Sequence, residues 1–211
     1  LIVSLMLMTV GTVGMYVGIV GLKPIAAEFG ISRGVGSLPY ALFMLGYGFG
    51  NVIHGRLADR YGILLPLLIG SVALSAGLIL SAQAESLWQF LAAIALLGGM
   101  LGSSAVFAPI IADVSLWFTG RRGLAVAFVL SGSYFAGAIW PPALQYLISE
   151  YGWRSAFATV GYFCLATMVP MSLSLYRKPA HLFADKGAPR ERQFVRPLGL
   201  SPSVLQCTLC V

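Results

Sequence analysis

Residues 55–62 bring one acid, two bases and two glycines together within eight positions, as Gly55-Arg56-Leu57-Ala58-Asp59-Arg60-Tyr61-Gly62. Asp59 can be held as an anion by an arginine or by the N–H groups at the start of a helix. Gly62 can adopt the positive φ that ends a helix. The pattern predicts a charged turn that biases how neighbouring helices pack, and the alternative is an ordinary basic turn. Its working residues would be Gly55, Arg56, Asp59, Arg60 and Gly62.

A second group combines aromatic rings with small polar groups at helical spacing. Tyr47 and Asn51 are four residues apart and share a helix face, as do Ser103 and Phe107. Such side chains can stack on a small solute and hydrogen-bond to it, without ligating a metal. The alternative is helix packing and an aromatic belt at the membrane surface. The candidate set is Tyr16, Tyr47, Asn51, Ser103, Phe107, Ser133, Tyr134 and Trp140.

The histidines and cysteines do not suggest an enzyme. An intramembrane protease needs a serine and a histidine on facing helices, but we expect His54 at a helix end and His181 in the polar tail. Cys207 and Cys210 form a single pair, whereas a tetrahedral metal site needs four ligands. We therefore predict no catalytic residues, no metal site and no cofactor.

The elements that carry these residues are expected to lie in lipid. Charged residues make up 9% of the 211 residues, and the mean hydropathy is +0.87, whereas a soluble domain has about 25% charged residues. Each charge-free run exceeds the roughly 20 residues that a spanning helix needs, and barrel strands are about half as long. The sequence predicts an all-α membrane protein with six transmembrane helices, within residues 1–22, 34–55, 61–84, 86–112, 123–149 and 155–176.

The distribution of positive charge predicts the orientation of these helices. Ten of the 13 Lys and Arg residues fall in alternate connections and in the tail, and three fall in the other connections. This asymmetry is the positive-inside pattern. It favours a lipid bilayer over nucleic acid as the partner of a chain with net charge +6. We expect a multi-pass protein of the cytoplasmic (inner) membrane with both termini in the cytoplasm.

Short matches suggest that the second group of three helices repeats the first. Tyr61-Gly62 and Tyr151-Gly152 are offset by 90 residues, and Arg33-Gly34 and Arg122-Gly123 by 89. Because three is odd, the second copy would be inverted across the membrane, as in many transporters. We predict a bundle over 1–176, a basic cytoplasmic linker over 177–200 and the start of a truncated seventh helix over 201–211. Leu1 lies within an apolar run, so we also expect an incomplete chain.

Residues 55–62 resemble the signature loop of the major facilitator superfamily, Gly-x-Leu-(Ala/Gly)-Asp-Arg-(Phe/Tyr)-Gly. Residues 150–157 resemble the Gly-Trp-Arg-x-x-Phe entrance to helix 6 of many members. Residues 117–125 are similar to the branch of monocarboxylate transporters and oxalate–formate exchangers. The chain departs from the family at Ile63, where basic residues usually follow, and in 86–112, which lacks the arginine that many members carry.

The resemblance implies the N-terminal six-helix half of a twelve-helix transporter, with the substrate cavity between two halves. It also implies that helices 1, 2, 4 and 5 face that cavity, with Tyr47, Ser103 and Tyr134 near mid-depth and Trp140 toward the outer surface. We expect half of a secondary transporter that moves a small solute, an organic anion of monocarboxylate type, by alternating access. A multidrug or solute exporter of the same fold and an inactive truncated fragment are the alternatives. The partners would be the bilayer, the solute and the C-terminal half.

Overall fold

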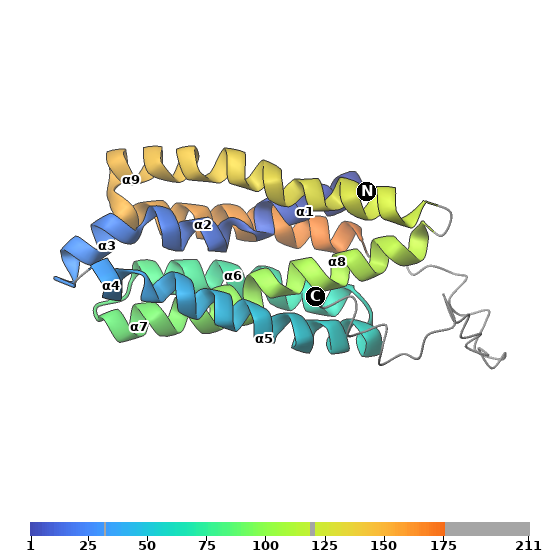
Figure 1. Cartoon of the computed structure of the whole chain (residues 1–211), viewed down its shortest axis with the longest axis horizontal. Helices are drawn as coiled ribbons and strands as arrows, with labels where there is room; N and C mark the ends of the chain where they lie inside the picture. Colours follow the sequence, from blue (N-terminus) through green and yellow to red (C-terminus); the bar gives the residue numbers. More distant parts are fainter. Residues whose placement is uncertain (32, 119–120, 176–211) are drawn as a thin grey trace, which may run out of the picture. The chain divides into compact units, whose positions relative to one another are not determined.

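The computed structural model describes residues 1–31, 33–118 and 121–175 (Figure 1). The predicted linker over 177–200 and the predicted helix start over 201–211 lie outside these ranges. Every element within them is a helix. The expected all-α architecture is therefore confirmed for the described part of the chain.

The first predicted helix forms as three consecutive segments. They are α1 (Ile2–Gly11), α2 (Val13–Val20) and α3 (Leu22–Glu28), with single-residue breaks at Thr12 and Gly21. The Thr12 hydroxyl donates to the Met8 carbonyl at 2.6 Å, a local bond that bends helices. The helical path extends beyond the predicted end at residue 22.

The signature residues are helical, which corrects the prediction of a loop over 55–62. The short α4 (Arg33–Gly36) is followed by α5 (Leu38–Tyr61). Leucine, alanine and arginine are good helix formers, so the polarity of this stretch does not unwind it. The helix ends at Gly62, whose φ of 83° is the predicted positive value.

The remaining chain also stays helical longer than predicted. After α6 (Leu64–Ala82), the fourth predicted helix comprises α7 (Leu87–Ala92), the π-helix η1 (Ala93–Ser103) and α8 (Ser104–Trp117), ending beyond residue 112. The final element, α9 (Arg122–Ser174), is interrupted at Gly152, with φ 77° and ψ 159°. The predicted loop over 150–154 is thus a turn at one glycine. The part of α9 before Gly152 is called the first arm, and the part after Gly152 is called the second arm.

Within the described residues, four stretches are long and apolar enough to cross a membrane: Ile2–Val20, Leu64–Ala82, Leu87–Trp117 and Arg122–Ser174. α5 has sufficient length, with 24 residues, but Tyr47, Asn51 and His54 interrupt its apolar character. The most polar long helix therefore carries both the signature residues and part of the candidate set.

Glycines allow the helix backbones to touch around η1. A Cβ on Gly50 would lie 2.0 Å from the Met100 carbonyl oxygen, and one on Gly46 would lie 2.4 Å from that of Ala95. A Cβ on Gly77 of α6 would lie 2.7 Å from the Gly98 nitrogen. These separations leave no room for a side chain, so η1 is fixed closely between α5 and α6, as is typical of small residues at membrane helix contacts.

A polar clamp holds the end of the bundle where α9 turns back. The Arg154 guanidinium donates to Glu28 at 2.7 and 3.1 Å and to the Ala82 carbonyl at 2.8 Å. The Trp153 indole N–H also donates to Glu28, and its ring meets Phe90 edge-on at 5.8 Å. The clamp therefore joins α3, the C-terminus of α6, α7 and the second arm of α9.

The clamp stabilises the folded protein less at acid pH than at neutral pH. The hydrogen bond from Arg154 is the main cause that holds the pKa of Glu28 below its ordinary value of 4.5, against the opposing effect of burial. Because the folded-state pKa is the lower one, the stabilisation is present above pH 4.5 and is lost as the pH falls through the folded value. We expect Glu28→Gln to lower the melting temperature in detergent at neutral pH by up to about 3 °C, since exposed ion pairs contribute about 1 kcal/mol or less.

The control for this measurement is Glu85→Gln. Glu85 uses its backbone N–H, not its carboxylate, in its described hydrogen bond to Gln89. The Glu85→Gln protein should therefore melt at the same temperature as the unchanged protein. A Glu28→Gln protein that melts like the unchanged protein at neutral pH would contradict the clamp.

Candidate functional site

An aromatic cluster forms where α5 meets η1 and α8. The Tyr47 ring stacks on Phe43 with centroids 6.4 Å apart and meets Phe107 edge-on at 6.2 Å. One turn along α5, the Asn51 amide donates to the Tyr47 carbonyl at 2.8 Å. Tyr47, Asn51 and Phe107 of the predicted set are thus brought together. Phe43, which is 1% exposed, belongs to the cluster but has no polar atom to mark it in the sequence.

Three buried side-chain atoms among the described residues lack a hydrogen-bond partner: Asn51 Oδ1, Ser103 Oγ and Ser133 Oγ. All three belong to the predicted set. Buried polar atoms are nearly always paired, so each exception needs an explanation such as a bound molecule or a second conformation. Together they offer two hydroxyl groups and one acceptor, with no charge.

The contrast with neighbouring serines shows that the unpaired state is not a property of helical serine. Ser71 and Ser75 of α6 are equally buried and donate to the carbonyls one turn earlier, at 2.7 and 2.8 Å. Ser104, beside Ser103, donates to the Met100 carbonyl at 2.5 Å. Ser103 lies at the junction of η1 and α8, and a Cβ on Gly14 would be 2.9 Å from its oxygen. Ser103 therefore faces α2.

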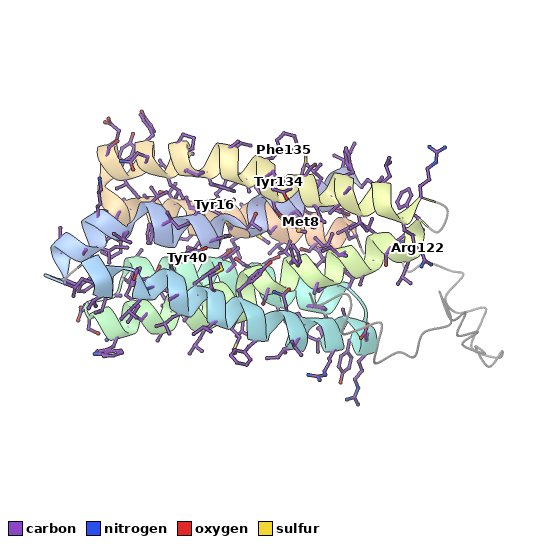
Figure 2. All side chains as sticks on the ribbon, in the orientation of Figure 1. Met8, Tyr16, Tyr40, Arg122, Tyr134 and Phe135 are labelled. Carbon is purple, nitrogen blue, oxygen red and sulfur yellow. The ribbon has the colours of Figure 1, made fainter. Side chains whose placement is uncertain are left out.

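Tyr16 and Ser133 meet between α2 and the first arm of α9. The Tyr16 hydroxyl donates to the Ser133 backbone carbonyl at 3.4 Å, and the Ser133 hydroxyl has no hydrogen-bond partner. Figure 2 shows Tyr16 on α2 and Tyr134 on the first arm of α9. Tyr134 is 81% exposed, so it lies on an open face of this arm, apart from the aromatic cluster.

Trp140 is placed by helix packing. Its indole N–H donates to the Thr9 carbonyl at 2.7 Å, and its ring meets Phe163 of the second arm at 6.0 Å. Thr9 in turn donates to the Gly132 carbonyl at 3.0 Å. Tryptophan has one polar donor, and here the protein uses it. Trp140 is therefore a packing residue whose one hydrogen-bond donor is already used.

The signature residues lie at one end of the bundle. The side chains of Arg56, Asp59 and Arg60 are exposed in the last turns of α5, and the Arg60 guanidinium lies over the Tyr61 ring at 5.4 Å. In Figure 1, this end also holds the N-terminus, the end of α8 and the start of α9. Gly62 ends the helix there, so the charged side chains of these residues lie on the surface of the bundle.

His54 is a buried residue within α5, not the helix-end residue that the sequence suggests. It is 1% exposed, and its Nδ1 lies 3.0 Å from the Gly50 carbonyl and 3.1 Å from the Ser104 hydroxyl. A carbonyl can only accept, so this contact favours a proton on Nδ1. His54 links α5 to the start of α8. No pattern in the sequence distinguished this buried position from a surface one.

The side chains that usually ligate metal ions do not form a cluster within the described ranges. No group of three or more His, Cys, Asp or Glu residues there could hold a metal ion. What the geometry does offer is aromatic surface, hydroxyl groups and one amide oxygen, which suits reversible binding of a small molecule.

Comparison with known proteins agrees with this geometry. The family described as Major Facilitator Superfamily matches residues 2–208. Mouse monocarboxylate transporter 11 is 36% identical over 128 residues, 58% of this chain and 28% of the relative. Human monocarboxylate transporter 12 is 33% identical over 153 residues, 72% of this chain and 28% of the relative. The Agnestins efflux protein AgnL12 of Paecilomyces divaricatus is 34% identical over 140 residues, which are 65% of this chain and 31% of the relative.

The matched segments span less than a third of the length of these relatives. The family nevertheless matches nearly the whole chain, and its transporters are membrane proteins, in keeping with the apolar helices of this one. The predicted resemblance is thereby confirmed. The chain is a multi-pass membrane protein that belongs to the Major Facilitator Superfamily, with monocarboxylate transporters among its relatives.

Proposed function

We propose that the chain forms half of a secondary active transporter that moves a small solute, an organic anion of monocarboxylate type, by alternating access. The observation that carries this proposal is the set of unpaired buried atoms on α5, η1 and α9. A transporter must expose its binding groups to each side in turn, so groups left unpaired in one state gain partners in another. The names of the monocarboxylate transporter relatives support the solute class.

The proposed architecture is six transmembrane helices arranged as an inverted repeat of three. The two arms of α9 and the long α5 would bring the four apolar stretches to six spanning helices. Gly62 and Gly152, which occupy matching positions of the repeat, support it by their backbone conformations. They have φ/ψ of 83°/175° and 77°/159°. Inverted three-helix repeats are a recurrent basis of alternating access.

In the proposed orientation, both chain termini are cytoplasmic in the inner membrane. Figure 2 places Arg122 at the end of the bundle where Figure 1 shows the N-terminus. Arg56 and Arg60 end α5 at the same side, and the Glu28–Arg154 clamp lies at the other. The concentration of arginines supports a cytoplasmic location for that end.

A complete cavity would need a second six-helix half as partner. Sites in this class lie between two repeats that rock against each other. This chain matches less than a third of the length of the three relatives described above. The exposed Tyr134 and Phe135 of the first arm would then face that half or the solute. The proposal involves no bond-making step and no cofactor.

The second candidate function is export of a larger organic solute by the same fold. It is favoured by relatives with efflux in their names, such as AgnL12. The aromatic cluster of Tyr47, Phe43 and Phe107 would suit a planar solute as well. Direction of transport in inside-out and right-side-out vesicles distinguishes the two.

The transport proposal is tested with Ser103→Ala in a form that carries a second six-helix half. Loss of one hydrogen bond to the solute costs about 1 kcal/mol, so we expect about a fivefold higher KM for a labelled monocarboxylate in proteoliposomes. Ser75→Ala is the control, because its equally buried hydroxyl is satisfied within α6. The 211-residue chain alone should give no saturable uptake. Saturable uptake by that chain, or equal KM values, would contradict the proposal.

Asp59→Asn tests the role of the signature residues in the same two-half form. Asp59 is exposed at the end of α5, apart from the unpaired atoms. We expect slower uptake with an unchanged dissociation constant, because the charge biases conformations without touching the solute. Weaker binding with an unchanged turnover rate would show the opposite.

Orientation is tested by single cysteines in a background that lacks Cys164, Cys207 and Cys210. Cysteines at Gly30, Glu85 and Ser149 should react in intact cells with an impermeant thiol reagent. A cysteine at Ala58 should react only after permeabilisation. Labelling at Ala58 from outside would reverse the assignment.

A further inference from the structure

A furrow lies between the α2–α3 segment and the first arm of α9, away from the Tyr47 cluster. It has a volume of about 480 Å³, which is within the usual range of small-molecule sites, roughly 300–1,000 Å³. Five of its lining residues are apolar and two are polar. They are Ile19, Val20, Leu22, Pro141 and Pro142, with Lys23 and Gln145.

The two polar residues lie at the same end of the furrow. The path from α1 to α2 runs in the same direction as the first arm, because Thr9 of α1 contacts Gly132, whereas Tyr16 of α2 lies against Ser133 and Gly137. Lys23 and Gln145 are the last lining residues on their respective sides, and both are exposed. One rim of the furrow thus carries an ammonium and an amide above apolar walls.

The clamp leaves Lys23 available to a ligand. The nearest acid along the chain is Glu28, whose carboxylate is engaged by Arg154 and Trp153. Among the described residues, the structure gives Lys23 no ion pair. A carboxylate at the rim would therefore meet an unopposed positive charge and an amide that can donate a hydrogen bond.

The other end of the furrow approaches the polar contact of Tyr16. Tyr16 lies seven residues before Lys23 and Gly137 four before Pro141, so each shares a helix face with a lining residue. A Cβ on Gly137 would be 2.9 Å from the Tyr16 hydroxyl oxygen. Tyr16 therefore lies beyond the lining residues at this end, where its hydroxyl donates to the Ser133 carbonyl.

We propose that this furrow binds a small organic anion with a compact apolar body, its carboxylate at Lys23 and Gln145 and its body against Val20 and the two prolines. This deepens the proposed function, on which it rests for the identity of the anion as transported solute. A free acid is a better occupant than a lipid, because an acyl chain needs an extended apolar path. Here the volume of about 480 Å³ suits a small molecule, and the lining residues end at Lys23 and Gln145.

The test is calorimetric binding of benzoate to the 211-residue chain in phosphatidylcholine nanodiscs. Benzoate should bind, its neutral analogue benzamide more weakly, and benzylammonium not measurably. Lys23→Gln should weaken benzoate binding about fivefold, as expected for loss of one partly exposed charge contact, and Lys23→Arg should largely preserve it. Arg122→Gln, which removes a cation at the opposite end (Figure 2), is the control and should bind normally.

Each remaining outcome overturns one idea and leaves the other. Equal benzoate affinity in the unchanged protein and Lys23→Gln would refute the furrow site, whatever the two-half form transports. Loss of benzoate binding in discs containing phosphatidylglycerol, with no effect of that lipid on Lys23→Gln discs, would assign the furrow to a lipid anion. Lys23-dependent benzoate binding without transport of monocarboxylates by the two-half form would preserve the site and refute the proposed function.

Discussion

The bilayer cannot hydrogen-bond to polar atoms, so each one that a helix buries must find its partner within the protein. Most of this structure follows from that constraint. Ser71 and Ser75 bond to their own helix, Trp140 uses the carbonyl of Thr9, and Arg154 caps the C-terminus of α6 through Ala82. The buried oxygens of Asn51, Ser103 and Ser133 are the exceptions to this pairing among the described residues.

The membrane character and helical content could be predicted from the sequence, because length and apolarity depend on composition alone. The helix ends could not. The stretch from Gly55 to Tyr61 contains three charged residues, yet it stays helical because its residues favour helix, so polarity did not mark the helix end. The π-helix η1 likewise has no signal in the spacing of apolar residues. Its glycine contacts with α5 and α6 depend on backbones distant in sequence.

The candidate site could be predicted where its contacts lie within one helix. Spacing placed Tyr47 with Asn51, and Ser103 with Phe107, on common faces. Contacts between helices were beyond such reasoning. Phe43 has no polar atom, His54 looked like a helix-end residue, and the Glu28–Arg154 ion pair joins positions 126 residues apart. Trp140 shows the reverse case, since an aromatic residue at suitable depth is used for packing.

The two ends of the bundle differ in a way that suits a rigid half moving as a unit. At one end, the clamp joins α3, α6, α7 and the second arm through charged and aromatic contacts. At the other, the arginines of α5 and Asp59 are exposed and free of such cross-links to a neighbouring helix in the described structure. Motion against a partner would leave the clamped helices together and change what Asp59 meets. The furrow lies on the clamped side, and its two walls belong to helices that are joined elsewhere by contacts of Thr9 and Tyr16 with the first arm of α9. A solute in the furrow would meet a preformed surface. The buried unpaired oxygens would contact that solute only after the helices rearrange.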